Sequence, residues 1–293
     1  SYGITIPAAI AYSEFDEEVQ RYSATELRSG LGAVNMKSSG NSFLDGSVGF
    51  DNDLCFENGA NDLGLTCYNG NFEPSQATPY YFSVGAVNSD GKHTSYSTAG
   101  ANLLVSAPAG EYGELAPAMV TTDQMTCLRG YSGFPAADSY DNDYFPGFFA
   151  GFFPFNNPGH PENASCNYTS TFNGTSSAAP NASGVVALIA SANPALSYRD
   201  IRHILVSTST MVDKDNAPVV LDLADGEFQA HQGWVKNAAG FNFNNYYGFG
   251  RVNAGAAVAM AKSYKTNLAA AVIADWTGVG SYAETPSSLA LPV

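Results

Sequence analysis

The sequence predicts an α/β protein in which a mainly parallel sheet is flanked by helices. Short apolar segments of strand length alternate with segments whose apolar residues recur at helical spacing, and this alternation is typical of parallel sheets. The chain has 293 residues, of which 45% are hydrophobic, so it can bury a large core and disorder is not expected.

The first predicted element is an amphipathic helix from Ser13 to about Arg28. Ser13 is a candidate N-cap with acidic residues in the turn that follows, and four apolar side chains recur at roughly helical spacing. These side chains are Phe15, Val19, Tyr22 and Leu27. Strands are then predicted at residues 33–39, which stop at Gly40-Asn41, and at residues 80–87 and 118–122.

Three helices are predicted in the second half of the chain. The first is rich in small and apolar residues and runs through residue 191. The second begins at Ser197, has Asp200 three residues later as in a capping box, and runs to about Val206. The third covers residues 253–264 and is packed by small side chains.

The charge balance excludes some classes of partner. The chain carries 12 basic and 27 acidic residues, a net charge of −15, which argues against nucleic acid or an anionic membrane as a partner. A cationic substrate would be attracted. No segment is long and apolar enough to cross a bilayer, because the aromatic run at residues 145–155 is too short and is broken by Pro and Gly.

The cysteine pattern favours two local disulfides. The four cysteines are Cys55, Cys67, Cys127 and Cys166, and the simplest pairing joins neighbours, Cys55 with Cys67 and Cys127 with Cys166. Such bridges imply an oxidising compartment and hence a secreted, extracellular protein. The alternative is four reduced cysteines.

Residues 128–172 do not fit the alternation of strands and helices. They are rich in Gly, Pro, Asn, Asp and Phe, and so long a loop inside a domain is usually functional. Because the segment precedes a candidate nucleophile, it is predicted to be an insertion near the active site. A disulfide-clamped surface excursion is the alternative.

The most informative motif is residues 173–180, Asn-Gly-Thr-Ser-Ser-Ala-Ala-Pro. Ser176 lies at the predicted start of the apolar helix, where the helix dipole favours a developing oxyanion. Pro180 is predicted to lie where a missing N–H is tolerated. The arrangement suits acyl transfer by Ser176, and the alternative is an ordinary Ser/Thr helix cap.

The pattern Gly-Thr-Ser-x-Ala-x-Pro resembles the nucleophile motif of the subtilisin-like serine proteases. Residues 120–123, 193–203 and 246–258 are similar to runs of the kexin and furin branch. The resemblance implies that Asn41 donates to the oxyanion beside the N–H of Ser176. It also implies that two short segments pair with the backbone of a polypeptide substrate. Their residues are Ser1, Tyr2 and Gly3 on one side and Ser38, Ser39 and Gly40 on the other.

Kexins cut after basic residues, which requires an acidic group at the base of the first specificity pocket. The resemblance puts Glu73 at that position, where a carboxylate would pair with Lys or Arg. A solvated loop residue beside Pro74 is the alternative. The second acid of furin-like enzymes is absent, since Ile4 to Ile6 are uncharged, so a single Lys or Arg is expected to suffice.

The family's catalytic Asp and His signatures do not occur in these residues. None of His93, His160, His203 and His231 matches the catalytic His. Residues 1–265 are therefore expected to be the C-terminal portion of a catalytic domain, inactive alone, with the N-terminal portion of the same domain as the partner that supplies Asp and His. Residues 266–293 are expected to be a tail or linker toward a missing downstream domain.

The chemistry requires no cofactor, although structural calcium is a candidate because the family commonly uses it. The acidic clusters that could bind it are residues 51–53, 138–143 and 213–216, and none matches an EF-hand loop. Two other functions stay open: a non-catalytic binding or inhibitory fragment on the same scaffold, and an acyltransferase or esterase that uses the same serine.

Overall fold

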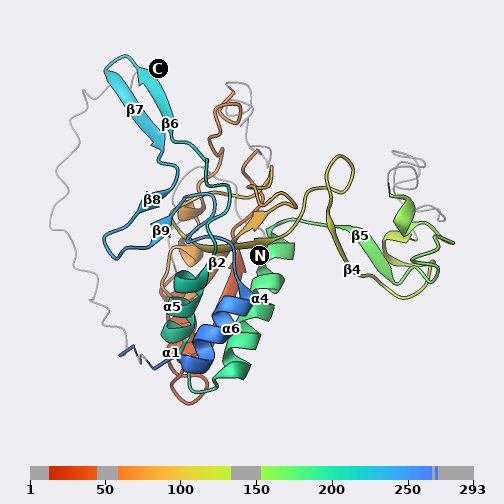
Figure 1. The fold of residues 1–293 in the computed structure, drawn as a ribbon, viewed down its shortest axis with the longest axis horizontal. Coiled ribbons are helices and arrows are strands. Elements are labelled where there is room, and N and C mark those ends of the chain that lie inside the picture. Colours follow the sequence, from red (N-terminus) through yellow and green to blue (C-terminus); the bar gives the residue numbers. More distant parts are fainter. Residues whose placement is uncertain (1–12, 45–58, 133–152, 266–267, 270–293) are drawn as a thin grey trace.

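A three-stranded parallel sheet lies at the centre of the computed structural model (Figure 1). The structure describes residues 13–44, 59–132, 153–265 and 268–269. The strands are β1 (Asn35–Ser38), β2 (Tyr81–Val87) and β3 (Leu103–Pro108), in the order β1-β2-β3. Asn35 pairs with Tyr81 in the first ladder, and Ser83 pairs with Leu103 in the second. The predicted parallel sheet and its first two strands are therefore confirmed.

The third predicted strand does not belong to this sheet. β4 (Met119–Thr122) pairs antiparallel with β5 (Tyr168–Phe172) in a separate two-stranded sheet. Its side chains alternate between half-buried and exposed, as expected of a strand with one solvated face, whereas β3 is almost wholly buried. The sequence prediction missed β3, the strand that completes the central sheet within the described residues.

Within the described residues, four helices accompany the sheet: α1 (Glu14–Thr25), α4 (Thr175–Ala192), α5 (Tyr198–Thr208) and α6 (Ala254–Ser263). The starts of α1 and α5 follow the predicted caps. The Ser13 side chain accepts from Asp16 N–H, and Asn253 caps α6 in the same way. Ser197 and Asp200 form a complete capping box on α5. Local sequence thus determines where α1, α5 and α6 begin.

Apolar residues of the sheet and of the helices share one core. α4 contacts all three strands and packs against α6, where small residues from both helices are fully buried. The largest fully buried side chains of this core include Tyr80, Phe82, Leu104, Ile189, Ile201, Ile204 and Leu205. Because α4 crosses the sheet through this core, its first turn is held rigidly at the ends of the strands.

Short antiparallel pairs complete the described structure. β6 (Val219–Leu223) pairs with β7 (Gly226–His231), and β8 (Val235–Lys236) pairs with β9 (Asn242–Phe243). The β6–β7 hairpin projects away from the helices, and β4 and β5 extend from the opposite side of the molecule (Figure 1). None of the described helices is long and apolar enough to span a membrane.

The apolar stripe of α1 is not covered by the described residues. Phe15 is 75% exposed, Val19 51% and Tyr22 54%, although they have the spacing of a core-facing stripe. β1 is the edge strand of the central sheet, and its outer side has no neighbouring strand among the described residues. An apolar helix face and an open parallel edge are both features that a further layer of protein normally covers.

Candidate active site

Ser176 is the exposed residue of the first turn of α4. Its neighbours Thr175 and Ser177 are 1% and 2% exposed, whereas Ser176 is solvent-accessible. The turn is set by Gly174, which precedes the helix at φ 82° and ψ 165°, a left-handed conformation that favours glycine. The fold therefore presents a single accessible hydroxyl at the positive end of an 18-residue helix.

The N–H groups at the start of α4 are bonded to side chains from other elements. The Gly174 N–H donates to the Tyr96 hydroxyl at 2.9 Å, and the Thr175 N–H donates to Asn41 Oδ1 at 2.8 Å. These partners are 78 and 134 residues away in sequence. Tertiary contacts, rather than a local cap, satisfy the donors that a helix N-terminus leaves open.

Among the next three backbone N–H groups, those of residues 176–178, two are hydrogen-bonded and one has no acceptor among the described residues. The Ser177 N–H donates to the Gly174 carbonyl at 2.9 Å, and the Ala178 N–H donates to the same oxygen at 3.4 Å. The Ser176 N–H has no acceptor within the part of the chain that the structure describes. One unused backbone donor therefore lies beside the accessible hydroxyl, as in an oxyanion hole.

Asn41 lies over this turn, directly after β1 and Gly40. Its Oδ1 also accepts from Thr175 Oγ1 at 2.9 Å, and Thr175 Oγ1 accepts from the Gly40 N–H at 3.1 Å. These bonds fix the amide so that Nδ2 faces the turn, since a Cβ built on Gly174 would lie 3.1 Å from Nδ2. Among the described residues Nδ2 has no acceptor, and Asn41 is exposed. It is a second available donor at this turn.

The position of Pro180 differs from the prediction. α4 begins at Thr175, so Pro180 is its sixth residue and lies beyond the turn in which a missing N–H has no consequence. Without that N–H, the Ser176 carbonyl loses the helical bond it would receive from four residues later. Packing of α4 against the sheet stabilises the helix despite this lost bond.

Thr175 and Tyr96 are site residues that the sequence prediction missed. Thr175 is adjacent to the predicted nucleophile, but nothing in the sequence indicates that its hydroxyl joins Asn41 to Gly40. Tyr96 lies in a polar turn before β3, yet its side chain is only 3% exposed and its hydroxyl contacts Gly174. Both contacts connect residues that are distant in sequence.

The segment around Glu73 lies near the Ser38–Gly40 segment. Ser39 is buried and its carbonyl accepts from Gln76 Nε2 at 3.3 Å, three residues after Glu73. Glu73 is half-buried between two 3₁₀ turns, η1 (Gly70–Phe72) and η2 (Pro74–Gln76), and its carboxylate accepts from the Ser75 hydroxyl. Burial, with a further contribution from the Glu73 charge, raises the pKa of Tyr68. Glu73 is therefore neither deeply buried nor freely solvated.

The histidines serve structural contacts. His93 Nε2 lies 2.7 Å from the Ser97 carbonyl, and the His93 ring is 4.7 Å from that of Phe43. His231 stacks on Tyr246 at 4.1 Å, although the sequence predicts it in a loop and the structure has it on β7. His203 contacts the Tyr264 hydroxyl, and His160 accepts from the Glu162 N–H. Within the described residues no histidine is hydrogen-bonded to Ser176.

Burial of His93 predicts a pH-dependent stability. Burial lowers the pKa of His93 from 6.5 to about 4, so the folded protein holds it neutral where an unfolded chain would bind a proton. Neutral His93 therefore makes its full contribution to the free energy of unfolding above pH 6.5. This contribution is lost as the pH falls toward 4, a decrease on the order of 3 kcal/mol.

The measurement is urea unfolding between pH 7 and pH 4 for the unsubstituted protein and for His93→Gln. The variant should start less stable, and its curve should be flatter over this range. His203→Gln is the matched control and should keep the full pH dependence. Parallel curves for the unsubstituted protein and His93→Gln would contradict the assignment.

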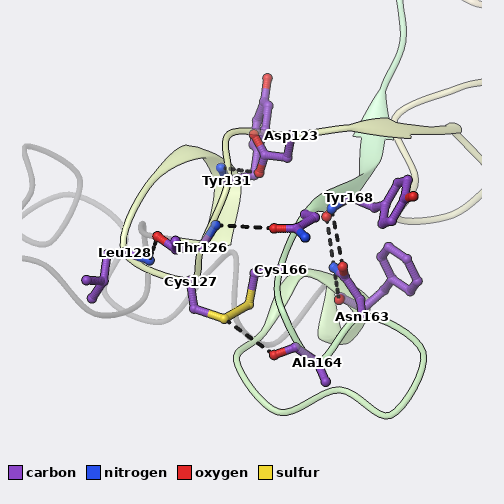
Figure 2. The surroundings of a disulfide bond; sticks show 11 residues. Asp123, Thr126, Cys127, Leu128, Tyr131, Asn163, Ala164, Cys166 and Tyr168 are labelled. Carbon is purple, nitrogen blue, oxygen red and sulfur yellow. Dashed lines mark hydrogen bonds between the residues drawn. A yellow bond between two sulfur atoms is a disulfide. The ribbon is translucent and has the colours of Figure 1, made fainter.

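A disulfide clamps the arm, by which we mean residues 119–132 and 153–172. Cys127 and Cys166 are bonded with an S–S distance of 2.06 Å, as the sequence predicts (Figure 2). Their separation of 39 residues corresponds to roughly 4 kcal/mol on the chain-entropy model. Cys67 is also disulfide-bonded, and its predicted partner Cys55 lies outside the described residues, as do Ser1, Tyr2 and Gly3.

Hydrogen bonds stiffen the same arm. The Asn163 side chain donates to the carbonyls of Phe155 and Tyr168 and accepts from the Tyr168 N–H (Figure 2). β5 ends at Phe172, four residues before Ser176 in the chain. The arm is thus a disulfide-clamped excursion that leads directly into the first turn of α4, and its role as an active-site rim stays a prediction.

The described residues contain no cluster of three His, Cys, Asp or Glu side chains that could hold a metal ion. Two of the three predicted acidic clusters, residues 51–53 and 138–143, lie outside the described residues. In the third, Asp213 Oδ2 accepts from the Tyr247 hydroxyl at 2.9 Å. Calcium binding stays a prediction.

A helix that packs on a parallel sheet and carries an accessible serine on its first turn, with two unused donors beside it, fits the class of α/β serine hydrolases. Residues 10–250 match the model of the subtilase family, Peptidase S8, and the chain belongs to this family. It is 32% identical over 271 residues to an extracellular serine protease of Aeromonas sobria, a match that covers 90% of this chain and 41% of the relative. It is 39% identical over 193 residues to a microbial serine proteinase of Aeromonas salmonicida, covering 63% and 28%.

Comparison with solved structures leads to the same family. The crystal structure of the Aeromonas sobria serine protease superposes with a TM-score of 0.72 at 31% identity, covering 92% of this chain and 43% of that chain. The same protease in complex with the chaperone ORF2 gives a TM-score of 0.71. Human neuroendocrine convertase 2 is 44% identical, but over 100 residues that cover 34% of this chain. The chain spans less than half the length of these Aeromonas relatives.

Proposed function

We propose that this chain is the nucleophile-bearing part of a secreted serine endopeptidase. The observation that carries the proposal is the pair of unused donors, the Ser176 N–H and Asn41 Nδ2, beside the accessible Ser176 hydroxyl. Secretion is supported by the disulfide and by the extracellular relative. Binding of the ORF2 chaperone is a property of the Aeromonas sobria protease and is not part of the proposal.

The proposed reaction is acyl transfer. Ser176 Oγ attacks the scissile carbonyl while its proton passes to a histidine base, and the carbonyl electrons form an oxyanion held by the two donors. The C–N bond then breaks, and the base returns the proton to the leaving amine. Water attacks the resulting acyl-enzyme ester in the same way and releases the acid.

The base and the carboxylate that orients it are proposed to come from the N-terminal portion of the same catalytic domain. Three features support a docking surface for it. The outer edge of β1 is open among the described residues, and the α1 stripe of Phe15, Val19 and Tyr22 is exposed. An apolar hollow of about 350 Å³ lies between β1 and α4, lined by side chains that include Met36, Val186 and Ala190. A parallel strand and a helix from that portion fit such a surface.

Labelling with a fluorophosphonate, which reacts with activated serines, tests the proposal. We expect covalent labelling at Ser176 in the assembled protein and none in these 293 residues alone. Absence of labelling in the assembled protein would favour a non-catalytic binding or inhibitory fragment. Labelling together with ester turnover but without peptide cleavage would favour an esterase or acyltransferase.

Glu73 is proposed to select basic side chains, on the support of the family resemblance, its partial burial and its position near Ser39. Glu73→Gln should lower kcat/KM for substrates cleaved after Lys or Arg by roughly 10- to 100-fold, because a charge-assisted bond is lost. Peptide kinetics measure this. Glu114→Gln, at an exposed acid with the same charge change, is the control. An equal loss for a peptide with Leu at that position would contradict the assignment.

A further inference from the structure

The Tyr96 hydroxyl connects two backbone groups that are distant in sequence. It accepts from the Gly174 N–H at 2.9 Å and donates to the Gly110 carbonyl at 2.5 Å. The side chain is 3% exposed, so water does not compete for these bonds. Burial raises the pKa of Tyr96 to about 12, and the hydroxyl therefore keeps the proton that it donates.

The bond holds Gly174, the residue with the greatest backbone freedom in the nucleophile turn, by which we mean residues 174–176. Gly174 precedes Ser176 by two positions and adopts φ 82°, and a glycine has wide conformational freedom. The Tyr96 hydroxyl is the acceptor for its N–H, while Asn41 Oδ1 is the acceptor for the Thr175 N–H. The peptide groups on either side of Gly174 are thus each held by a different side chain.

The other end of the Tyr96 bond is itself rigid. Gly110 follows β3 and forms a bridge with Ala118, and a Cβ on Gly110 would lie 2.7 Å from Ala118 Cα. Beside it, the Glu111 carboxylate accepts from both the N–H and the hydroxyl of Ser95. Tyr96 is therefore anchored where β3 ends and the chain turns toward β4.

We propose that Tyr96 is a positioning residue for Ser176, an inference that rests on the proposed protease function. Its hydroxyl transmits the rigid geometry of the β3 end to Gly174. The Ser176 N–H and hydroxyl then converge on the same scissile carbonyl. Without the hydroxyl, Gly174 regains conformational freedom and the oxyanion donor is displaced during part of the time, although Tyr96 touches no reacting atom.

The test is Tyr96→Phe in the protein expressed from its complete coding sequence. Tyr246→Phe is the matched control, because the Tyr246 side chain is 7% exposed and its buried hydroxyl has no hydrogen-bond partner among the described residues. Tyr96→Phe should lower kcat and the rate of fluorophosphonate inactivation by about 10- to 100-fold, while KM stays within about 2-fold of its original value. The reason is that a displaced donor stabilises the transition state less well but hardly affects binding of the ground state.

The outcomes separate this inference from the proposed function. If the unsubstituted protein is not labelled at Ser176, the proposed function fails. If it is labelled and Tyr96→Phe reacts as fast as Tyr246→Phe, the positioning role is overturned and the function stands. If kcat falls in Tyr96→Phe and KM rises by the same factor, the active site has loosened as a whole, and the positioning role would also be overturned.

If Tyr96→Phe does not unfold cooperatively, which would mean that it is not properly folded, a second variant tests the positioning role. Fluorotyrosine at position 96 keeps the ring and the oxygen but makes that oxygen a poorer acceptor for the Gly174 N–H. We expect a smaller fall in kcat, roughly 2- to 5-fold, in the same direction as for Phe. A kcat equal to that of the unsubstituted protein would overturn the positioning role.

Discussion

Replacing Ser176 with alanine in the assembled protein should lower kcat by roughly 10⁵- to 10⁶-fold. The structure offers no substitute nucleophile in this turn, because the neighbouring hydroxyls of Thr175 and Ser177 are 1% and 2% exposed. The two oxyanion donors and substrate binding would survive, so a residual acceleration of roughly 10³- to 10⁴-fold over water is expected. Peptide hydrolysis with fluorophosphonate labelling measures both effects.

The control for this prediction is Ser191→Ala. Ser191 lies on the same helix, is exposed and does not line the hollow between β1 and α4, so its loss changes the helix surface but not the first turn. This variant should keep full activity and labelling. Continued labelling of Ser176→Ala at another residue of α4 would show that the nucleophile has been assigned to the wrong side chain.

Replacing Asn41 with aspartate should lower kcat by about 10²- to 10³-fold with KM nearly unchanged. Aspartate keeps an oxygen that accepts from Thr175, so the start of α4 should hold its geometry. It removes the Nδ2 donor and adds a negative charge where the oxyanion develops. Asn41→Ala should lose activity as well, and should also be less stable, because the Thr175 N–H loses its acceptor.

Asn88→Asp is the matched control for Asn41→Asp. Asn88 Oδ1 also accepts two backbone N–H groups, those of Asp90 and Lys92, in the turn after β2. The same change there adds the same charge without removing a donor near Ser176. Steady-state kinetics on both variants decide the matter. A rise in KM without a change in kcat for Asn41→Asp would mean that Asn41 binds substrate and does not stabilise the oxyanion.

Features encoded by neighbouring residues could be predicted well. The Ser197 capping box and the Ser13 cap each involve residues within three positions of one another, and the structure has both. The Cys127–Cys166 pairing was the simplest choice and is present. Ser176 was found because its motif is contiguous, although its accessibility came from the structure.

Features encoded by distant residues could not be predicted in the same way. The location of residues 118–122 in an antiparallel pair depends on β5, which follows more than 40 residues later in sequence. The exposure of Phe15, Val19 and Tyr22 depends on what packs against α1, and no described residue covers these side chains. Periodicity shows that a face is apolar, but not what packs against it.

The sequence by itself determined the fold class, the family, the nucleophile candidate and the caps of α1 and α5, because these follow from patterns of residues close together in the chain. Only the tertiary structure decided which N–H groups at Ser176 are unused, since Asn41 and Tyr96 reach the turn from 134 and 78 residues away. A hydrogen bond depends on positions to within a few tenths of an ångström, and packing of α4 against the sheet sets those positions.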